Sequence, residues 1–305
     1  MKTKLTIFIA AALIPCWGFT QDSNDGGWLD SFPLQDYTIV STGKNPYWTL
    51  IPGRYVVLGA LEPDGGEFVV ISVLDETEMI GNIETRVVEE REYEHGKLKE
   101  ISRNFFAIAK RTKDVFYFGE DVDDYENGKV TGHGGQWRAG KNGARAGLYM
   151  PGKPVVGLRY YMEIHPGVAM DRAEIFETNA TVDTPAGTFR RSLVVTESSP
   201  LEAGDESYKR YAPKIGMIFD DGLELYKHGR KFPSERYIEF EITEDQMPAT
   251  AARIVRELHP TGIIREVKVE LHPDLALYAV ETLVDGKHWD VEVTNYGKVI
   301  RNTLD

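Results

Sequence analysis

The sequence predicts an α+β protein, in which a mainly antiparallel, curved β-sheet domain precedes a small helix-and-sheet module. Apolar and β-branched runs, separated by turn motifs, fill most of residues 47–242. No helical period of 3.6 residues occurs between Tyr47 and Glu241. One amphipathic helix and further strands follow within residues 245–305. These patterns predict two structural domains.

Residues 1–20 have the composition of a signal peptide. Lys2 and Lys4 give a positive start, and the apolar run from Leu5 to Ile14 is too short to span a bilayer. Small residues precede Gln21, which suits cleavage before that residue. We therefore expect an exported protein, either periplasmic or extracellular.

Cys16 is the only cysteine and lies within the predicted signal peptide. Lipidation of Cys16 is the less favoured alternative, because Pro15 occupies a position where lipoprotein boxes have a small residue. Cleavage before Gln21 leaves no thiol, which excludes disulfides, thiolate nucleophiles and cysteine-ligated metals. No other apolar run is long enough for a transmembrane segment.

The chain is acidic, with a formal net charge of −13. Loss of residues 1–20 removes two lysines and no acidic residue, which takes the charge to −15. Such a charge repels nucleic acid and anionic lipid surfaces. We expect no nucleic-acid partner, and solubility is the simplest role for the charge.

The elements before residue 135 are expected to be hairpins that follow a flexible lead-in at residues 21–46. Asn127-Gly128 is the strongest short hairpin signal. The expected strand pairs are residues 55–60 with 67–74, 85–94 with 97–109, and 114–119 with 129–133.

A further hairpin is expected at residues 173–195, around the turn Thr184-Pro185-Ala186-Gly187. Pro185 presets φ, and Gly187 can take the positive φ that closes the turn. The motifs V-x-T-P-A-G-T-F at residues 182–189 and Y-A-P-x-I-G at residues 211–216 resemble an uncharacterised family of exported bacterial β-rich proteins. That resemblance implies a curved sheet of the LolA-like half-barrel type, and it implies no chemistry.

The one clear helix is predicted at residues 247–258, with Ala251, Ile254, Val255 and Leu258 on one face. Strands are expected at residues 266–271, 275–284, 287–294 and 298–303. This helix, its "H-P-x-G-I-I-R-E-V" end and the final "G-K-V-I" resemble a PepSY-type module. The resemblance implies an inhibitor or chaperone of an exported peptidase as one alternative function.

The predicted site lies under a glycine-rich loop at residues 134–152, which crosses the sheet beside a cluster of aromatic residues. We expect Trp137 to anchor the loop against these aromatics and its cations to form a positive rim. The predicted ligand-binding residues are Trp137, Arg138, Arg145, Tyr149, Phe105, Phe116, Phe118 and Tyr160.

The leading functional hypothesis is non-catalytic binding of an apolar, amphiphilic or extended ligand, such as a lipid, with no cofactor. A hydrolase or a metal-dependent enzyme with dispersed residues is the alternative. Glu163 and His165 share a strand face, and Asp171 and Glu174 could complete a metal site with them. The acidic run at residues 120–126 could bind a cation, but a solvated hairpin end is the favoured explanation, because the spacing of an EF-hand is absent. No catalytic residue can be named.

Overall fold

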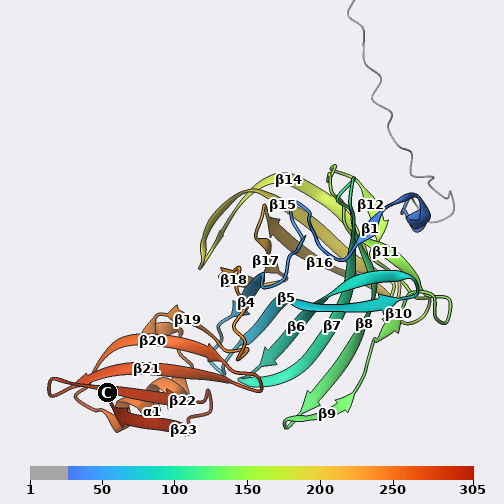
Figure 1. Ribbon diagram of the computed structural model, residues 1–305. Helices are drawn as coiled ribbons and strands as arrows, with labels where there is room; N and C mark the ends of the chain where they lie inside the picture. Colours follow the sequence, from blue (N-terminus) through green and yellow to red (C-terminus); the bar gives the residue numbers. More distant parts are fainter. Residues whose placement is uncertain (1–26) are drawn as a thin grey trace, which may run out of the picture.

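The computed structural model describes residues 27–305 (Figure 1). The predicted signal peptide, the alternative lipidation site at Cys16 and residues 21–26 of the lead-in lie outside the described residues. No helix in residues 27–305 is long and apolar enough to cross a membrane.

The described chain is essentially all-β, with 60% of residues in strands and 6% in helices. The predicted α+β class was therefore wrong. The helix predicted at residues 247–258 is present as α1 (Ala249–Leu258), but it is the only α-helix in residues 27–305. Two short 3-10 helices, η1 (Leu34–Asp36) and η2 (Glu244–Gln246), contribute only three residues each to the helical content. A single ten-residue helix is too short to form a structural layer of its own. β-Sheets form the body of both the large N-terminal part and the smaller C-terminal part of the chain.

One large antiparallel sheet of 16 strands forms most of the molecule. Its strands are β1 (Ile39–Val40), β4 (Tyr55–Ala60), β5 (Glu67–Ile80), β6 (Ile83–Glu94), β7 (Lys97–Ala109), β8 (Val115–Glu126), β9 (Lys129–Gly132), β10 (Trp137–Arg138), β11 (Arg145–Met150), β12 (Arg159–Tyr161), β13 (Glu163–Ile164), β14 (Arg172–Thr184), β15 (Gly187–Ser199), β16 (Glu202–Ala212), β17 (Gly216–Asp220) and β18 (Leu223–Gly229). A separate two-stranded sheet consists of β2 (Gly43–Lys44) and β3 (Thr49–Leu50).

The predicted pairs 55–60 with 67–74 and 85–94 with 97–109 are confirmed, as is the hairpin around residues 184–187. The third prediction was wrong in its pairing, because residues 129–132 pair with residues 124–126 and not with residues 114–119. Thr184 pairs with Gly187 across the turn between β14 and β15. Asn127 and Gly128 both have positive φ, as the tight turn between β8 and β9 requires.

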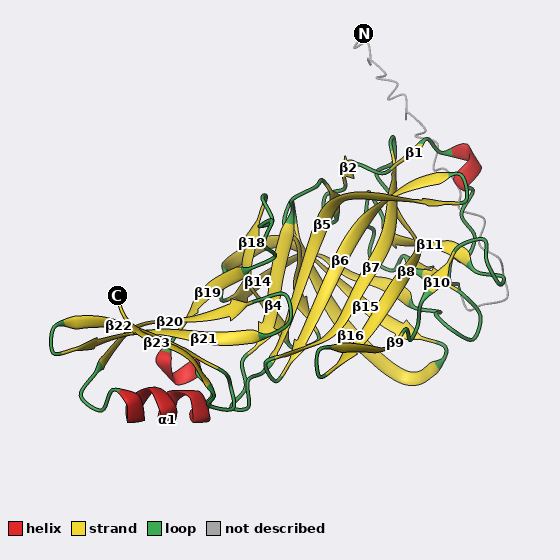
Figure 2. Cartoon of the chain, turned by 60° about the horizontal axis from the view of Figure 1, so that its bottom comes forward, coloured by secondary structure: helices red, strands yellow, loops and turns green. Residues whose placement is uncertain are grey.

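The large sheet curls into a nearly closed barrel (Figures 1 and 2). β12 pairs with β14 at one end of the strand order, and β13 pairs with β11 at the other end. Only Met162 separates β12 from β13, so one short stretch of chain joins the two edges. The sheet therefore closes further than the expected half-barrel.

A five-stranded antiparallel sheet lies beside the barrel, with α1 alongside it (Figure 2). Its strands are β19 (Ile238–Ile242), β20 (Ile263–Leu271), β21 (Ala276–Val284), β22 (Lys287–Val293) and β23 (Val299–Leu304). Buried residues of this sheet and of α1 share one apolar cluster with the outer face of the barrel. The barrel contributes Val57, Phe68, Val70, Tyr93 and Leu98 to that cluster.

The described part of the expected lead-in, residues 27–46, packs against the barrel. Leu29 bridges to Tyr160, and β1 pairs with β7. The ring of Phe32 lies 5.8 Å from the ring of Phe116. This segment therefore covers Phe116 on the outer face of β8.

Candidate functional site

A polar cavity of about 390 Å³ lies inside the barrel. Residues of β6, β7, β8 and β11 line one side, and residues of β15 and β16 line the other. This volume is within the range of small-molecule sites. The acidic residues of its lining are Glu90, Glu92, Glu100, Glu120, Glu163, Asp171, Glu197 and Glu202, and the one basic residue is Lys209.

Strand alternation explains why carboxylates gather on the inner face. Side chains two residues apart on a strand share a face, so Glu90 and Glu92 of β6 both point into the cavity. Glu90 pairs with Ser102 of β7, and Glu92 pairs with Glu100. The register between β6 and β7 therefore builds a continuous polar wall.

Aromatic rings form the floor of the cavity. The rings of Phe106 and Tyr117 stack at 4.6 Å, and the ring of Tyr149 lies 4.7 Å from that of Phe106. Trp48 directly precedes β3 in the chain, and its ring lies 4.7 Å from the ring of Tyr149. Trp137 packs against Tyr117 at 5.3 Å. A ligand in the cavity can therefore contact carboxylates on one side and rings on another.

Lys209 neutralises only part of this wall. Its Nζ lies 3.1 Å from a carboxylate oxygen of Glu197 and 3.4 Å from one of Asp220. Burial lowers the pKa of Lys209, but the two carboxylates outweigh this effect and raise it well above its usual value. Lys209 is therefore charged at neutral pH and is committed to these two partners.

Four glutamates of the wall have no hydrogen-bond or ion-pair partner for their carboxyl groups among the described residues. They are Glu90, Glu92, Glu100 and Glu163. Burial, followed by neighbouring carboxylates, raises the pKa of Glu100 to about 7. Burial raises the pKa of Glu90 to about 8 although Lys209 opposes the shift, and it also raises the pKa of Glu163. Burial therefore holds Glu90 and Glu163 largely in the neutral form at neutral pH, and a cation bound beside them would favour their ionised form.

Glu120 is linked to the aromatic floor. The hydroxyl group of Tyr117 lies 3.0 Å from Oε2 of Glu120 and also hydrogen-bonds to Oδ1 of Asn104. Burial raises the pKa of Glu120 to about 7, although the hydrogen bond with Tyr117 opposes the shift. This network holds one carboxyl group of the wall directly above the floor.

No group of three or more histidine, cysteine or acidic side chains in residues 27–305 is arranged to hold a metal ion. Within the metal set considered from the sequence, Glu163 and Asp171 line the cavity. Glu174 instead pairs with Arg159, at 2.7 Å. Asp121 and Asp123 of the acidic run pair with Arg138 and His133.

Only some of the residues predicted to bind the ligand lie at or next to the cavity. Tyr149 lines the cavity, and Trp137 is buried against its floor as expected. Tyr160 is fully buried, and its hydroxyl group donates to the carbonyl oxygen of Tyr149 at 3.5 Å. Phe116 faces the opposite way from Tyr117 and packs against Phe32. Phe105 and Phe118 are buried but do not line the cavity.

The cations of the predicted positive rim are largely paired. Arg138 lies 2.6 Å from a carboxylate oxygen of Asp121, and its guanidinium group stacks over Phe105 at 4.1 Å. Arg145 lies 3.2 Å from a carboxylate oxygen of Asp30. Their charges are thus offset locally.

Comparisons of this chain with known protein families, with curated proteins and with solved structures found no match. The geometry of the barrel and its cavity therefore carries the functional argument.

Sequence reasoning missed the acidic wall. The alternating acids of residues 90–92 and the polar run at 100, 102 and 104 are visible in the sequence. A polar inner face of a barrel gives the same pattern as a solvated outer face. Only the closure of the sheet distinguishes the two.

Proposed function

We propose that this protein is a non-catalytic binding protein that holds a small organic cation with an apolar part inside the barrel. A nearly closed antiparallel barrel is a fold of the binding type. The observation that supports the ligand class is the set of unpaired glutamates above an aromatic floor. The ligand is amphiphilic, as the sequence led us to expect, but its polar end is positive.

The charge balance of the cavity favours a cation. Eight acidic residues and one lysine line it, and the lysine already has two carboxylate partners. Partly buried carboxylates without partners are unfavourable, and an ammonium or guanidinium group relieves both their desolvation and their mutual repulsion. The faces of Phe106, Tyr117 and Tyr149 attract a cation as well as an apolar body.

A matched pair of probes tests the proposal. Phenethylamine and phenylacetate share an apolar body and differ in the sign of their charge. We expect isothermal titration at pH 8 to detect binding of phenethylamine and no binding of phenylacetate. Equal binding of the two probes, or binding of phenylacetate alone, contradicts the proposed ligand class.

Variants of the wall provide the second test. The double substitution Glu90→Gln and Glu163→Gln removes two unpaired carboxyl groups and should weaken phenethylamine binding by about tenfold or more. Glu257→Gln is the matched control, because Glu257 lies on the exposed face of α1. Unchanged affinity in the double variant removes the cavity as the binding site.

Carboxylate-based hydrolysis is the second candidate function. Glu90 and Glu120 have pKa values raised to about 8 and about 7, and a general acid at neutral pH needs such values. Mass spectrometry of a bound ester or amide that also carries a free amino group separates the two functions. Recovery of the intact compound after prolonged incubation supports binding, and cleavage that Glu120→Gln abolishes supports hydrolysis.

We also propose that the protein is exported. The support is the composition of residues 1–20 and the absence of cysteine from the rest of the sequence. An exported binding protein meets small amines directly from its surroundings.

A further inference from the structure

A second pocket, of about 560 Å³, is lined by cations and by no acidic residue. We call it the basic pocket and define it by its five charged residues. They are Lys44, Arg54, Lys113, Lys214 and Arg230. Asn45, Pro46, Thr49 and Pro213 complete its lining.

The basic pocket lies at the opposite end of the barrel from the acidic cavity. β7 carries Glu100 near its start, and the turn that follows β7 carries Lys113. β16 likewise starts at Glu202, and the turn that follows it carries Lys214. Two strands therefore run from the acidic cavity to the basic pocket, and the sites are separate.

None of the five cations forms an ion pair with a carboxylate of residues 27–305. Arg54 donates from Nη1 to the carbonyl oxygen of Lys214 at 3.0 Å, and Lys113 donates from Nζ to the carbonyl oxygen of Lys110 at 2.6 Å. By contrast, the exposed cations Arg145 and Arg159 are each paired with an acidic residue. Five unpaired cations around one pocket are unexpected in a protein with a net charge of −13.

Buried hydrogen bonds fix the backbone of the basic pocket. Nδ2 of Asn45 donates to the carbonyl oxygens of Lys113, Met150 and Pro151 at 2.8, 3.3 and 3.1 Å. The amide nitrogen of Lys214 donates to the carbonyl oxygen of Pro46 at 2.8 Å. Segments that carry three of the cations are therefore held at fixed positions, which lowers the entropy lost when a ligand binds.

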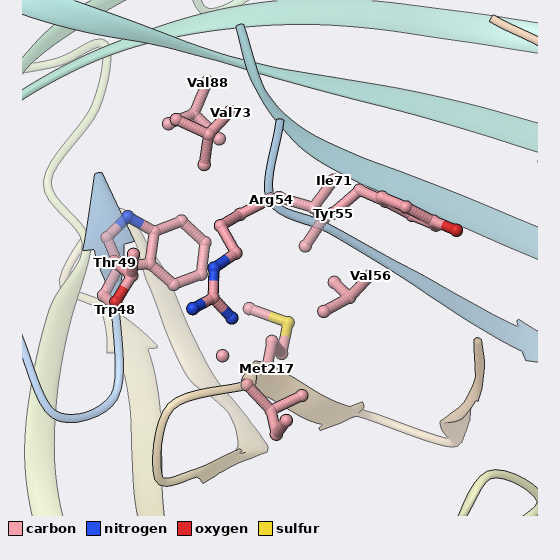
Figure 3. Close-up of a pocket in the computed structure, with 11 residues that line it drawn as sticks. Trp48, Thr49, Arg54, Tyr55, Val56, Ile71, Val73, Val88 and Met217 are labelled. Atoms are coloured by element: carbon pink, nitrogen blue, oxygen red, sulfur yellow. The ribbon is translucent and has the colours of Figure 1, made fainter. Parts of the chain in front are cut away.

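Arg54 is the most enclosed of the five cations. It also lines a narrow apolar pocket with Trp48 and Met217, and Figure 3 shows its guanidinium group turned toward that pocket. Burial and the nearby Arg230 lower the pKa of Arg54. Burial, and then Arg54 and Arg230, also lower the pKa of His228. The field at this end of the barrel is therefore positive.

We propose that the basic pocket binds a phosphate-type dianion. Guanidinium and ammonium groups are the side chains that bind phosphate oxygens, and arginine can do so with two parallel hydrogen bonds. Five unpaired cations exceed the charge of one carboxylate, so a doubly charged group fits them better. Free phosphate and the phosphomonoester headgroup of phosphatidic acid both present a group of this kind to the pocket.

The alternative reading is that these cations are merely solvated. Like charges about 8 Å apart at a surface repel each other by about 0.5 kcal/mol or more. Such a cost is small for one pair and larger for five charges in a concave pocket. Titration with inorganic phosphate separates the two readings, because solvated cations do not saturate with a defined stoichiometry.

The first arm of the experiment uses inorganic phosphate and the full chain, followed by isothermal titration at low ionic strength. We expect one phosphate to bind per chain, and the double variant Lys44→Gln and Arg230→Gln to weaken that binding by about tenfold or more. Both side chains are exposed, so the variant should fold normally. Lys141→Gln is the matched control, since Lys141 is exposed and lies outside the pocket.

The second arm identifies the source of the phosphate group. Vesicles that contain phosphatidic acid are compared with vesicles of phosphatidylcholine in a sedimentation assay. Binding of phosphatidic-acid vesicles that the double variant loses identifies a lipid headgroup, and binding of phosphate alone identifies a free ligand. Absence of binding in both arms, or equal losses in the double variant and in Lys141→Gln, overturns the proposal.

Discussion

Arg236 donates from Nη1 to both carboxylate oxygens of Glu89, at 3.0 and 2.9 Å. Glu89 is a barrel residue with a side chain only 1% exposed, and Arg236 lies just before the five-stranded sheet. Nε of Arg91 also donates to Glu89, at 2.8 Å. A buried carboxylate thus ties the module to the outer face of the barrel, beside their shared apolar cluster.

We predict that Glu89→Gln destabilises the protein by roughly 3–5 kcal/mol, because it leaves the buried guanidinium group of Arg91 without a counter-charge. Urea unfolding followed by circular dichroism measures this change. Glu257→Gln breaks an exposed pair with Arg253 on α1 and should cost under about 0.5 kcal/mol. A similar small cost for both variants contradicts the structural role of Glu89.

We predict that the ligand-free protein becomes less stable as the pH rises from 5 to 9. Burial raises the folded-state pKa of Glu90 from 4.5 to about 8. The folded state therefore holds a proton that the unfolded state has already lost in this range. The resulting stability is complete below pH 4.5 and disappears as the pH passes 8. Thermal unfolding at several pH values measures the loss.

The variant Glu90→Gln isolates the contribution of this one carboxyl group to the pH dependence of stability. At pH 9 the variant should be more stable than the wild type by roughly 1–3 kcal/mol, because an amide needs no proton to remain neutral. At pH 5 the two proteins should be nearly equal. A variant that is less stable than the wild type at both pH values contradicts the proposed protonation of Glu90.

Sequence patterns predicted the hairpins well but not the closure of the barrel. β7 was expected at residues 97–109 and is found there, because its alternation and its flanking turn are local signals. Residues 155–165 have the local pattern of one continuous strand. They instead split at Met162 into β12 and β13, which pair with strands at opposite edges of the sheet. Which edges meet is a property of the whole sheet and leaves no local signal.

The site could not be located from the sequence for a related reason. Both faces of β6 are polar, since Glu89 and Arg91 alternate with Glu90 and Glu92. The structure directs Glu89 outward against the module and Glu90 into the cavity. Neither face is fully solvated, and alternation alone does not tell them apart. The predicted fold class was wrong because the one clear helix was given more weight than the strands that the sequence also indicates on both sides of it.

Phenethylamine binding should tighten as the pH rises from 6 to 8.5. Glu100 and Glu120 have pKa values raised to about 7 by burial, so the wall gains negative charge over this range while the amine stays protonated. We expect about a tenfold gain in affinity, with release of protons on binding. Titration in buffers of different ionisation enthalpy counts those protons. Affinity that does not change with pH contradicts the assignment of these groups to the site.

The mature protein should begin near Gln21. The apolar run at residues 5–14 and its preceding lysines motivate this prediction. Amino-terminal sequencing of the protein from its native host measures the start directly. Retention of Met1 on soluble cytoplasmic material contradicts export. A lipid-modified Cys16 at the new terminus instead supports the lipoprotein alternative.

Trp137 connects the glycine-rich loop to the cavity, and Trp137→Ala should impair both stability and binding. The side chain is 3% exposed, and its ring lies 5.3 Å from that of Tyr117. Its removal leaves a cavity beside the aromatic floor and should cost about 3–5 kcal/mol in urea unfolding. Phenethylamine affinity should fall as well, because Tyr117 loses the packing that positions it.

Arg145→Ala is the matched control in the same loop. Arg145 forms a partly exposed pair with Asp30, so the substitution should change stability by less than about 1 kcal/mol and leave phenethylamine affinity unaltered. The positive rim predicted from the sequence requires the opposite pattern, in which Arg138→Ala and Arg145→Ala weaken uptake of a fatty acid. Tryptophan fluorescence during a fatty-acid titration decides between them. A saturable change that both arginine variants lose supports the rim, whereas no change in the wild type leaves the acidic cavity as the ligand site in the barrel.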